Sequence, residues 1–137
     1  FRVKHGYSPS SSNGWAFILA SDTDATGLYN ASQSSCLVVG VNFAGSDDLL
    51  KIWEQTSSST GSKSVKVISS STLNWESSVG TSAYGYVEVV RNANGDWSIG
   101  YSKSSFSDIT SIGTFSYTNP IHLNNLGVVY WYTATAD

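Results

Sequence analysis

Apolar and polar residues alternate along this chain in short runs, and Gly, Ser, Asn and Asp separate the runs at fairly even intervals. Such alternation indicates β-strands with one buried face, because an amphipathic helix repeats its apolar positions with a longer period. The run 15–20 is almost continuously apolar, which predicts a strand covered on both faces. Strands are expected over residues 1–5, 15–20, 36–43, 49–54, 65–68, 84–91, 97–101, 112–117 and 126–132.

The clearest local signal is a β-hairpin in the second half of the chain. Residues 84–91 and 97–101 both alternate, and Asn94-Gly95 lies between them. Asn-Gly tolerates the positive φ angles that a tight chain reversal requires. The polar stretches are predicted to be loops, and no helix is expected; these stretches include 8–14, 21–34 and 69–82.

Length and composition favour one all-β domain, an antiparallel β-sandwich over residues 1–137. Hydrophobic residues make up 40% of the 137 positions and charged residues only 12%, about half the usual share. No apolar run is long enough to span a membrane as a helix, so no membrane insertion is expected. Seven basic residues against ten acidic ones argue against a nucleic-acid partner.

Ser, Thr, Gly and Tyr are abundant and Lys and Glu are few, which favours an extracellular or cell-surface location. The sequence starts at Phe1 in strand-like residues and stops at Asp137 just after another expected strand. We therefore expect a fragment or processed piece of a longer multidomain secreted protein. Cys36 is the single cysteine and lies in an apolar run, so it forms no intrachain disulfide and is predicted to be buried.

Three segments, 14–22, 45–52 and 87–99, resemble in this order the concanavalin A-like lectin/glucanase superfamily. They are most similar to laminin-G-like jelly-roll modules of secreted bacterial surface proteins. In such modules an apolar strand ending in Arg, here Arg91, is followed by an Asn-Gly turn and then Trp, here Trp97. The resemblance implies a jelly-roll sandwich that lacks one or both terminal strands, which neighbouring segments or subunits would supply.

The superfamily includes glycoside hydrolases, which usually need two carboxylates close to the bond that they cleave. The three glutamates, Glu54, Glu76 and Glu88, have no other acidic residue two to five positions away. His5 and His122 lack a local acidic partner, and no Gly-x-Ser-x-Gly motif is present. The chain is therefore predicted not to be an enzyme.

Aromatic residues are the main candidates for ligand binding, because the C–H faces of sugars pack against aromatic rings. Trp75 follows Asn74 in a polar stretch, where exposure would make both residues ligand contacts. The alternative for Trp75 is a place in the core, as expected for the tryptophans of apolar strands. Tyr130 and Tyr132 alternate with Val129 and are predicted to form an exposed aromatic strip.

The resemblance to laminin-G-like modules also makes calcium a possible cofactor, since related modules often carry the ion on the sandwich rim. Asp22 and Asp24 lie in the loop after the second expected strand and are the candidate ligands, and Asp47-Asp48 occupies another turn. The alternative is that these aspartates stabilise their turns, because Asp readily bonds nearby backbone N–H groups.

The sequence alone leaves two functions open. The first is a non-catalytic extracellular recognition module that binds a glycan or a surface protein through rim loops. The second is a structural subunit of an extracellular fibre, sheath or surface layer that joins neighbouring subunits through its β-edges.

Overall fold

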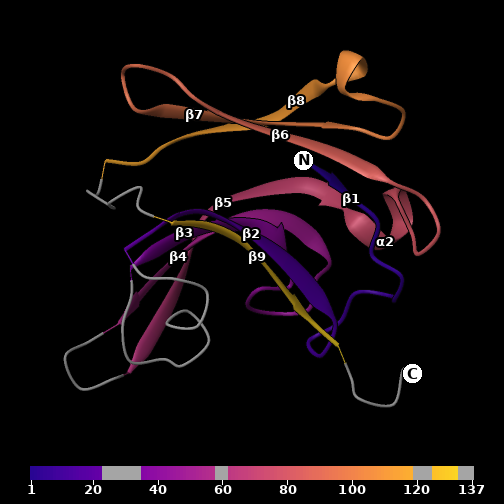
Figure 1. Ribbon diagram of the computed structural model, residues 1–137, viewed down its shortest axis with the longest axis horizontal. Helices are drawn as coiled ribbons and strands as arrows, with labels where there is room; N and C mark the ends of the chain where they lie inside the picture. The colour runs from indigo at the N-terminus through magenta and orange to yellow at the C-terminus, as the bar shows by residue number, and fades with distance from the viewer. Residues whose placement is uncertain (23–34, 58–61, 119–124, 133–137) are drawn as a thin grey trace.

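The computed structural model describes residues 1–22, 35–57, 62–118 and 125–132 and shows two antiparallel sheets packed as a β-sandwich (Figure 1). This confirms the expected fold class. The elements are β1 (Arg2–Val3), β2 (Gly14–Ser21), β3 (Cys36–Val41), β4 (Leu49–Ser57), β5 (Lys63–Asn74), α2 (Trp75–Ser78), β6 (Gly85–Arg91), β7 (Asp96–Ser102), η1 (Phe106–Asp108), β8 (Thr110–Ser116) and β9 (Asn125–Trp131).

The strand order determines which edges of the sandwich are open. One sheet has four strands in the order β1-β6-β7-β8, and the other has five in the order β5-β4-β3-β2-β9. Strands β5 and β8, each at the end of its sheet, lie against one another along one side. Strands β1 and β9 therefore form the edges on the opposite side.

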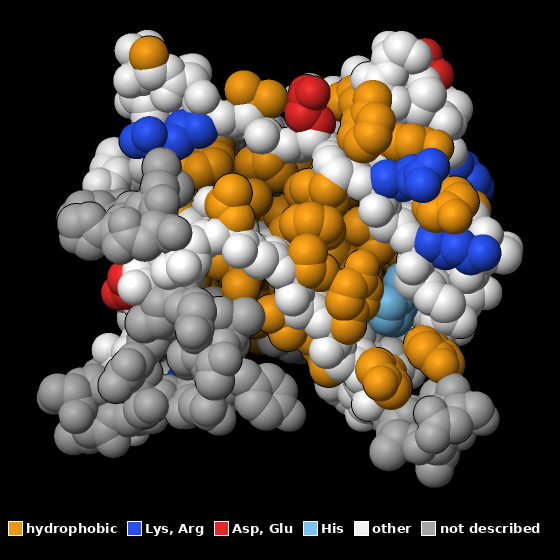
Figure 2. Space-filling view, viewed as in Figure 1, with side chains coloured by type: hydrophobic (Ala, Val, Ile, Leu, Met, Phe, Trp, Pro, Cys, Tyr) orange, Lys and Arg blue, Asp and Glu red, His pale blue; other side chains and the backbone are white. Residues whose placement is uncertain are grey.

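Apolar side chains cover both faces of the five-stranded sheet. The main core lies between the sheets and includes Trp15, Leu50, Val87 and Ile99. A second cluster on the outer face of the five-stranded sheet contains Ala16, Ile18, Cys36, Val38 and Trp53. Strand β2 supplies residues to both clusters, which confirms the prediction that this strand is covered on both faces. Apolar side chains also gather in the middle of the face seen in Figure 2, between the two sheets.

The predicted hairpin is the pair β6–β7, whose register runs from Tyr86↔Ser102 to Arg91↔Trp97. Its turn is held by Asn92, whose Oδ1 accepts the N–H groups of Asn94 at 3.0 Å and Asp96 at 2.9 Å. Gly95 has φ +88°, a conformation that glycine adopts without strain. The Asn-Gly signal was therefore a correct guide to this reversal.

The expectations of a loop over 69–82 and of a chain without a helix are both wrong. Strand β5 continues to Asn74, and the single-turn helix α2 follows at once. The buried serine in this part of β5 is satisfied by the neighbouring strand: the hydroxyl of Ser71 donates to the carbonyl of Leu50 on β4 at 2.7 Å. An edge strand tolerates such polar residues because much of its surface faces water, so serine content was a poor guide to a loop here.

Cys36 is fully buried, as expected. Burial raises the pKa of its thiol to about 12, so the reactive thiolate is not formed near neutral pH. Cys36 therefore acts as a small apolar residue.

Candidate functional site

Trp75 is not a ligand contact: its side chain is 0% exposed. Its ring packs edge-on against Trp15, with centroids 4.8 Å apart, and lies directly over Gly85. The core alternative for Trp75 is therefore the correct one. The polar neighbours of Trp75 belong to the end of β5 and the outer side of α2, so they do not determine which way the indole points.

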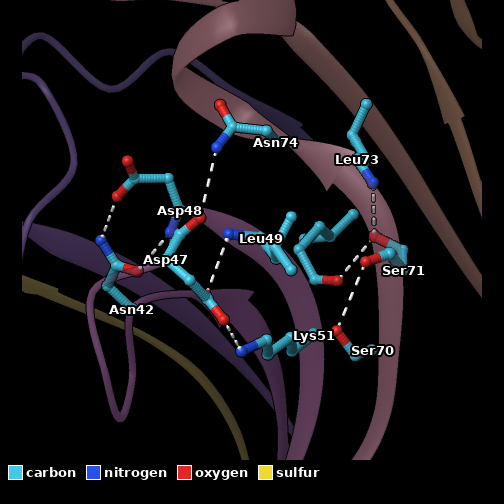
Figure 3. A network of polar contacts seen from close by, with 10 residues as sticks. Asn42, Asp47, Asp48, Leu49, Lys51, Ser70, Ser71, Leu73 and Asn74 are labelled. Atoms are coloured by element: carbon cyan, nitrogen blue, oxygen red, sulfur yellow. Dashed lines mark hydrogen bonds and ion pairs between the residues drawn. The ribbon is translucent and has the colours of Figure 1, made fainter.

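Asn74 has a structural role as the cap of α2 (Figure 3). Its Oδ1 accepts the N–H of Ser77 at 2.9 Å, and its Nδ2 donates to the carbonyl of Asp47 at 3.2 Å. Both ends of the amide are thus used within the protein, where they join α2 to the turn before β4. The prediction that Asn74 contacts a ligand beside an exposed Trp75 loses its basis.

The turn that holds Asp47 and Asp48 is stabilised by its own side chains (Figure 3). Asn42 Nδ2 donates to Asp48 Oδ1 at 2.7 Å, and the Asp48 N–H donates to Asn42 Oδ1 at 3.0 Å. Asn42 and Asp48 have φ of +58° and +61°, values that Asn and Asp tolerate better than most residues. The turn-stabilising alternative therefore describes these two aspartates.

Asp47 forms an ion pair with Lys51. Burial alone would raise the pKa of Asp47, but the hydrogen bonds from Lys51 and from the Leu49 N–H outweigh it and hold the pKa below its ordinary value. The carboxylate is therefore ionised and already paired near neutral pH.

The calcium prediction stays a prediction. Asp22 is exposed at the end of β2, and Asp24 lies outside the described residues. Within the part of the chain that the structure describes, no three His, Cys, Asp or Glu side chains gather to hold a metal ion. The described residues therefore form no coordination set for a metal ion.

Tyr130 and Tyr132 are exposed on one face of the β9 segment, as predicted, while Val129 and Trp131 turn to the other face. The ring of Tyr7 lies nearly parallel to that of Tyr132, with centroids 6.0 Å apart. Sequence reasoning missed Tyr7, because only folding brings the segment after β1 beside the end of β9.

A pocket of about 470 Å³ lies on the outer face of the five-stranded sheet. Its lining combines apolar side chains with polar groups from segments that are distant in sequence: Ser11, Asn42, Phe43, Ala44, Gly45, Ser46, Gln55, Lys63, Val65, Val129 and Trp131. This volume lies within the range of small-molecule sites, about 300–1,000 Å³. None of the four residues predicted to bind a ligand lines it.

Aromatic residues form one wall of the pocket. Phe43 packs edge-on against Trp131, with centroids 6.1 Å apart, and contacts the buried Trp53 at 5.8 Å. Polar residues also line the pocket: Ser11 and Ser46 are exposed, whereas Gln55 on β4 is buried. One indication of this site was present in the sequence: the alternation in β9 predicted that Trp131 lies on the opposite face of the strand from Tyr130 and Tyr132.

None of the described residues forms a helix with the length and hydropathy needed to cross a membrane. Comparison with protein-family models finds no match for this chain. Searches of curated proteins and of solved structures likewise find no significant match.

Proposed function

We propose that this chain is a non-catalytic, extracellular carbohydrate-recognition module that binds its glycan in the outer-face pocket. The observation that carries the proposal is the mixed lining of the pocket, which combines the aromatic side chains of Phe43 and Trp131 with the exposed polar residues Ser11 and Ser46. A sugar ring needs such a mixed surface, since its C–H face packs on aromatic rings and its hydroxyl groups need hydrogen-bond partners.

The proposal moves the binding site from the rim loops to the face of a sheet. Side chains on paired strands hold their positions better than side chains on loops, which suits a recognition site. Phe43 is fixed by Trp53 beneath it and by Trp131 beside it. The aromatic wall is therefore already in place before a ligand arrives.

The structural role of Glu54 supports a non-catalytic function. Glu54 is buried, and Tyr117 donates a hydrogen bond to its Oε1 at 2.6 Å. Glu54 thus joins the two sheets, and it does not line the outer-face pocket.

The test is a glycan-array screen followed by calorimetric titration of the best oligosaccharide, with calcium and again with chelator. We expect Phe43→Ala to weaken binding about tenfold, the equivalent of ~1.4 kcal/mol. Phe106→Ala is the matched control, since it removes an exposed phenylalanine from η1, next to the four-stranded sheet, and should leave binding unchanged.

Different outcomes would move or remove the site. If Tyr132→Ala abolishes binding and Phe43→Ala does not, Tyr130 and Tyr132 hold the glycan in place of the pocket. If chelator alone abolishes binding, the calcium prediction at Asp22 and Asp24 gains support. No binding to any glycan in either buffer contradicts the proposed function for the sugars on the array.

A further inference from the structure

Strand β9 is an edge strand with an apolar face that no described strand covers. Its ladder with β2 runs from Gly14↔Trp131 to Ser21↔Asn125, and no described strand pairs with its other side. Alternate side chains along the β9 segment are exposed: Leu126 at 79%, Val128 at 42%, Tyr130 at 50% and Tyr132 at 59%. Unpaired backbone groups beside an exposed apolar row are the features of a pairing surface.

The opposite edge of the same sheet is built differently. Strand β5 carries Lys63 and Lys66 and lies against β8. Charged side chains on an edge strand discourage pairing with another chain. Residues 125–132 contain no charged residue, so this edge lacks that protection.

We propose that β9 pairs antiparallel with β9 of a second copy of this chain, about a two-fold axis at Val129. The absence of charge means that two identical strands approach without like-charge repulsion. Four exposed apolar side chains form a patch on the order of several hundred Å², less than the roughly 800 Å² that one partner of a standard interface buries, so the paired backbone edge has to supply the rest. A second copy brings the same patch and the same unpaired backbone edge.

The side chains themselves select the register. In an antiparallel pair, directly opposite residues point to the same face of the sheet. An axis at Val129 sets Val128 opposite Tyr130 of the partner subunit, and Leu126 opposite Tyr132 of the partner subunit. Aromatic and β-branched side chains are favourable cross-strand neighbours.

The other face is complementary in the same register. Gly127 comes opposite Trp131 of the partner subunit, so a large ring lies beside a residue without a side chain. Aromatic residues across from strand glycines cover the exposed backbone. Each large side chain therefore meets a smaller one, and the five-stranded sheets join into one continuous sheet.

This pairing is isologous and closes after two copies. The expected product is therefore a dimer, which differs from the open-ended fibre considered from the sequence. The inference goes beyond glycan binding and does not depend on it, because its test measures mass and not ligand.

The first experiment is sedimentation analysis of the intact chain over a wide range of concentrations, where a reversible dimer dissociates on dilution. Val128→Lys places a charge in the apolar row and should raise the dimer dissociation constant by at least ~10-fold. Val67→Lys makes the same change at an exposed valine on β5 and should have no effect. Near-UV circular dichroism of the tryptophans checks that each variant is folded. If Val128→Lys does not fold, Leu126→Lys replaces it as the variant that places a charge in the apolar row.

The second experiment tests the register. Val128→Lys and Tyr130→Glu should each disfavour the dimer, whereas the double variant sets the introduced lysine opposite the introduced glutamate of the partner and should restore it. A wild-type chain that stays monomeric, or equal loss in Val67→Lys, overturns the dimer. A folded double variant that stays monomeric overturns the two-fold axis at Val129, as does growth beyond two copies.

Discussion

Glycines let the largest side chains of the core approach the backbone closely. A Cβ added at Gly85 would lie 2.3 Å from the ring of Trp75. Trp75 is fully buried, so its ring cannot move aside without disturbing the packing between the sheets.

Gly85→Ala should therefore destabilise the fold by about 1–3 kcal/mol through overpacking. Gly113→Ala is the matched control, because nothing lies within 4 Å of its added Cβ. Chemical denaturation of both variants measures the difference. Equal unfolding midpoints would show that the Trp75 ring moves to make room for the added methyl group, which would contradict the prediction.

His5 is buried and should make stability depend on pH. Burial lowers the pKa of its imidazole from the ordinary 6.5, although a hydrogen bond with the Tyr7 backbone opposes the shift. The unfolded chain then binds a proton that the folded chain resists, so stability falls as pH drops below about 6.5.

His5→Phe should flatten this dependence between about pH 7 and the lowered pKa, because phenylalanine does not titrate. Denaturation midpoints of both proteins across that range measure the two slopes. Parallel slopes would assign the pH dependence to other groups. The phenyl ring keeps an aromatic contact with Tyr7, whose ring lies edge-on at 6.3 Å from His5.

At the scale of elements, a single amide defines the end of β5 and the start of α2. Asn74 satisfies an N–H of the first helical turn and also holds the Asp47 carbonyl of the turn before β4. The carbonyl of Asp48 accepts the N–H of Trp75 at 2.7 Å, which adds a second link at the same place. These bonds position α2 so that Trp75 enters the core.

Asn74→Ala should lower stability by about 1 kcal/mol or more through loss of the cap. Asn74→Asp keeps a capping oxygen but loses the amide donor to Asp47, so its effect should be intermediate. Ser77→Ala is the control, since its backbone N–H still reaches the cap. Thermal unfolding of the three variants ranks them; a loss in Ser77→Ala as large as that in Asn74→Ala would contradict the capping role.

At the scale of the whole molecule, a buried hydrogen bond joins the two sheets on their closed side. Tyr117 follows β8, and its hydroxyl donates to Glu54 on β4 at 2.6 Å. The residues are 63 positions apart in sequence, so the bond forms only when the sheets have met.

Tyr117→Phe should destabilise the protein by about 1–2 kcal/mol, because the buried carboxyl group of Glu54 loses this donor. Tyr101→Phe is the matched control: its hydroxyl is buried and has no hydrogen-bond partner among the described residues, so its removal should be neutral or stabilising. Urea denaturation of both variants gives the comparison. A larger loss in Tyr101→Phe would contradict the importance of the inter-sheet bond.

Local pattern alone was enough to predict most of the strands, the β6–β7 hairpin and the sandwich class. The apolar run of β2, the alternation in β9 and the Asn94-Gly95 turn act within a few neighbouring residues, and steric and burial preferences at that range are carried by residue type. Cys36 was predicted to be buried for the same reason, because an apolar strand surrounds it.

The candidate site was decided by tertiary structure. Trp75 lies in a polar stretch, yet the orientation of α2 and the space above Gly85 turn it into the core. The pocket unites Phe43, Gln55 and Trp131 from three different strands or turns, and strand order is what brings them together. Side-chain direction and strand neighbours depend on contacts between distant segments, so periodicity along the chain carries no information about them.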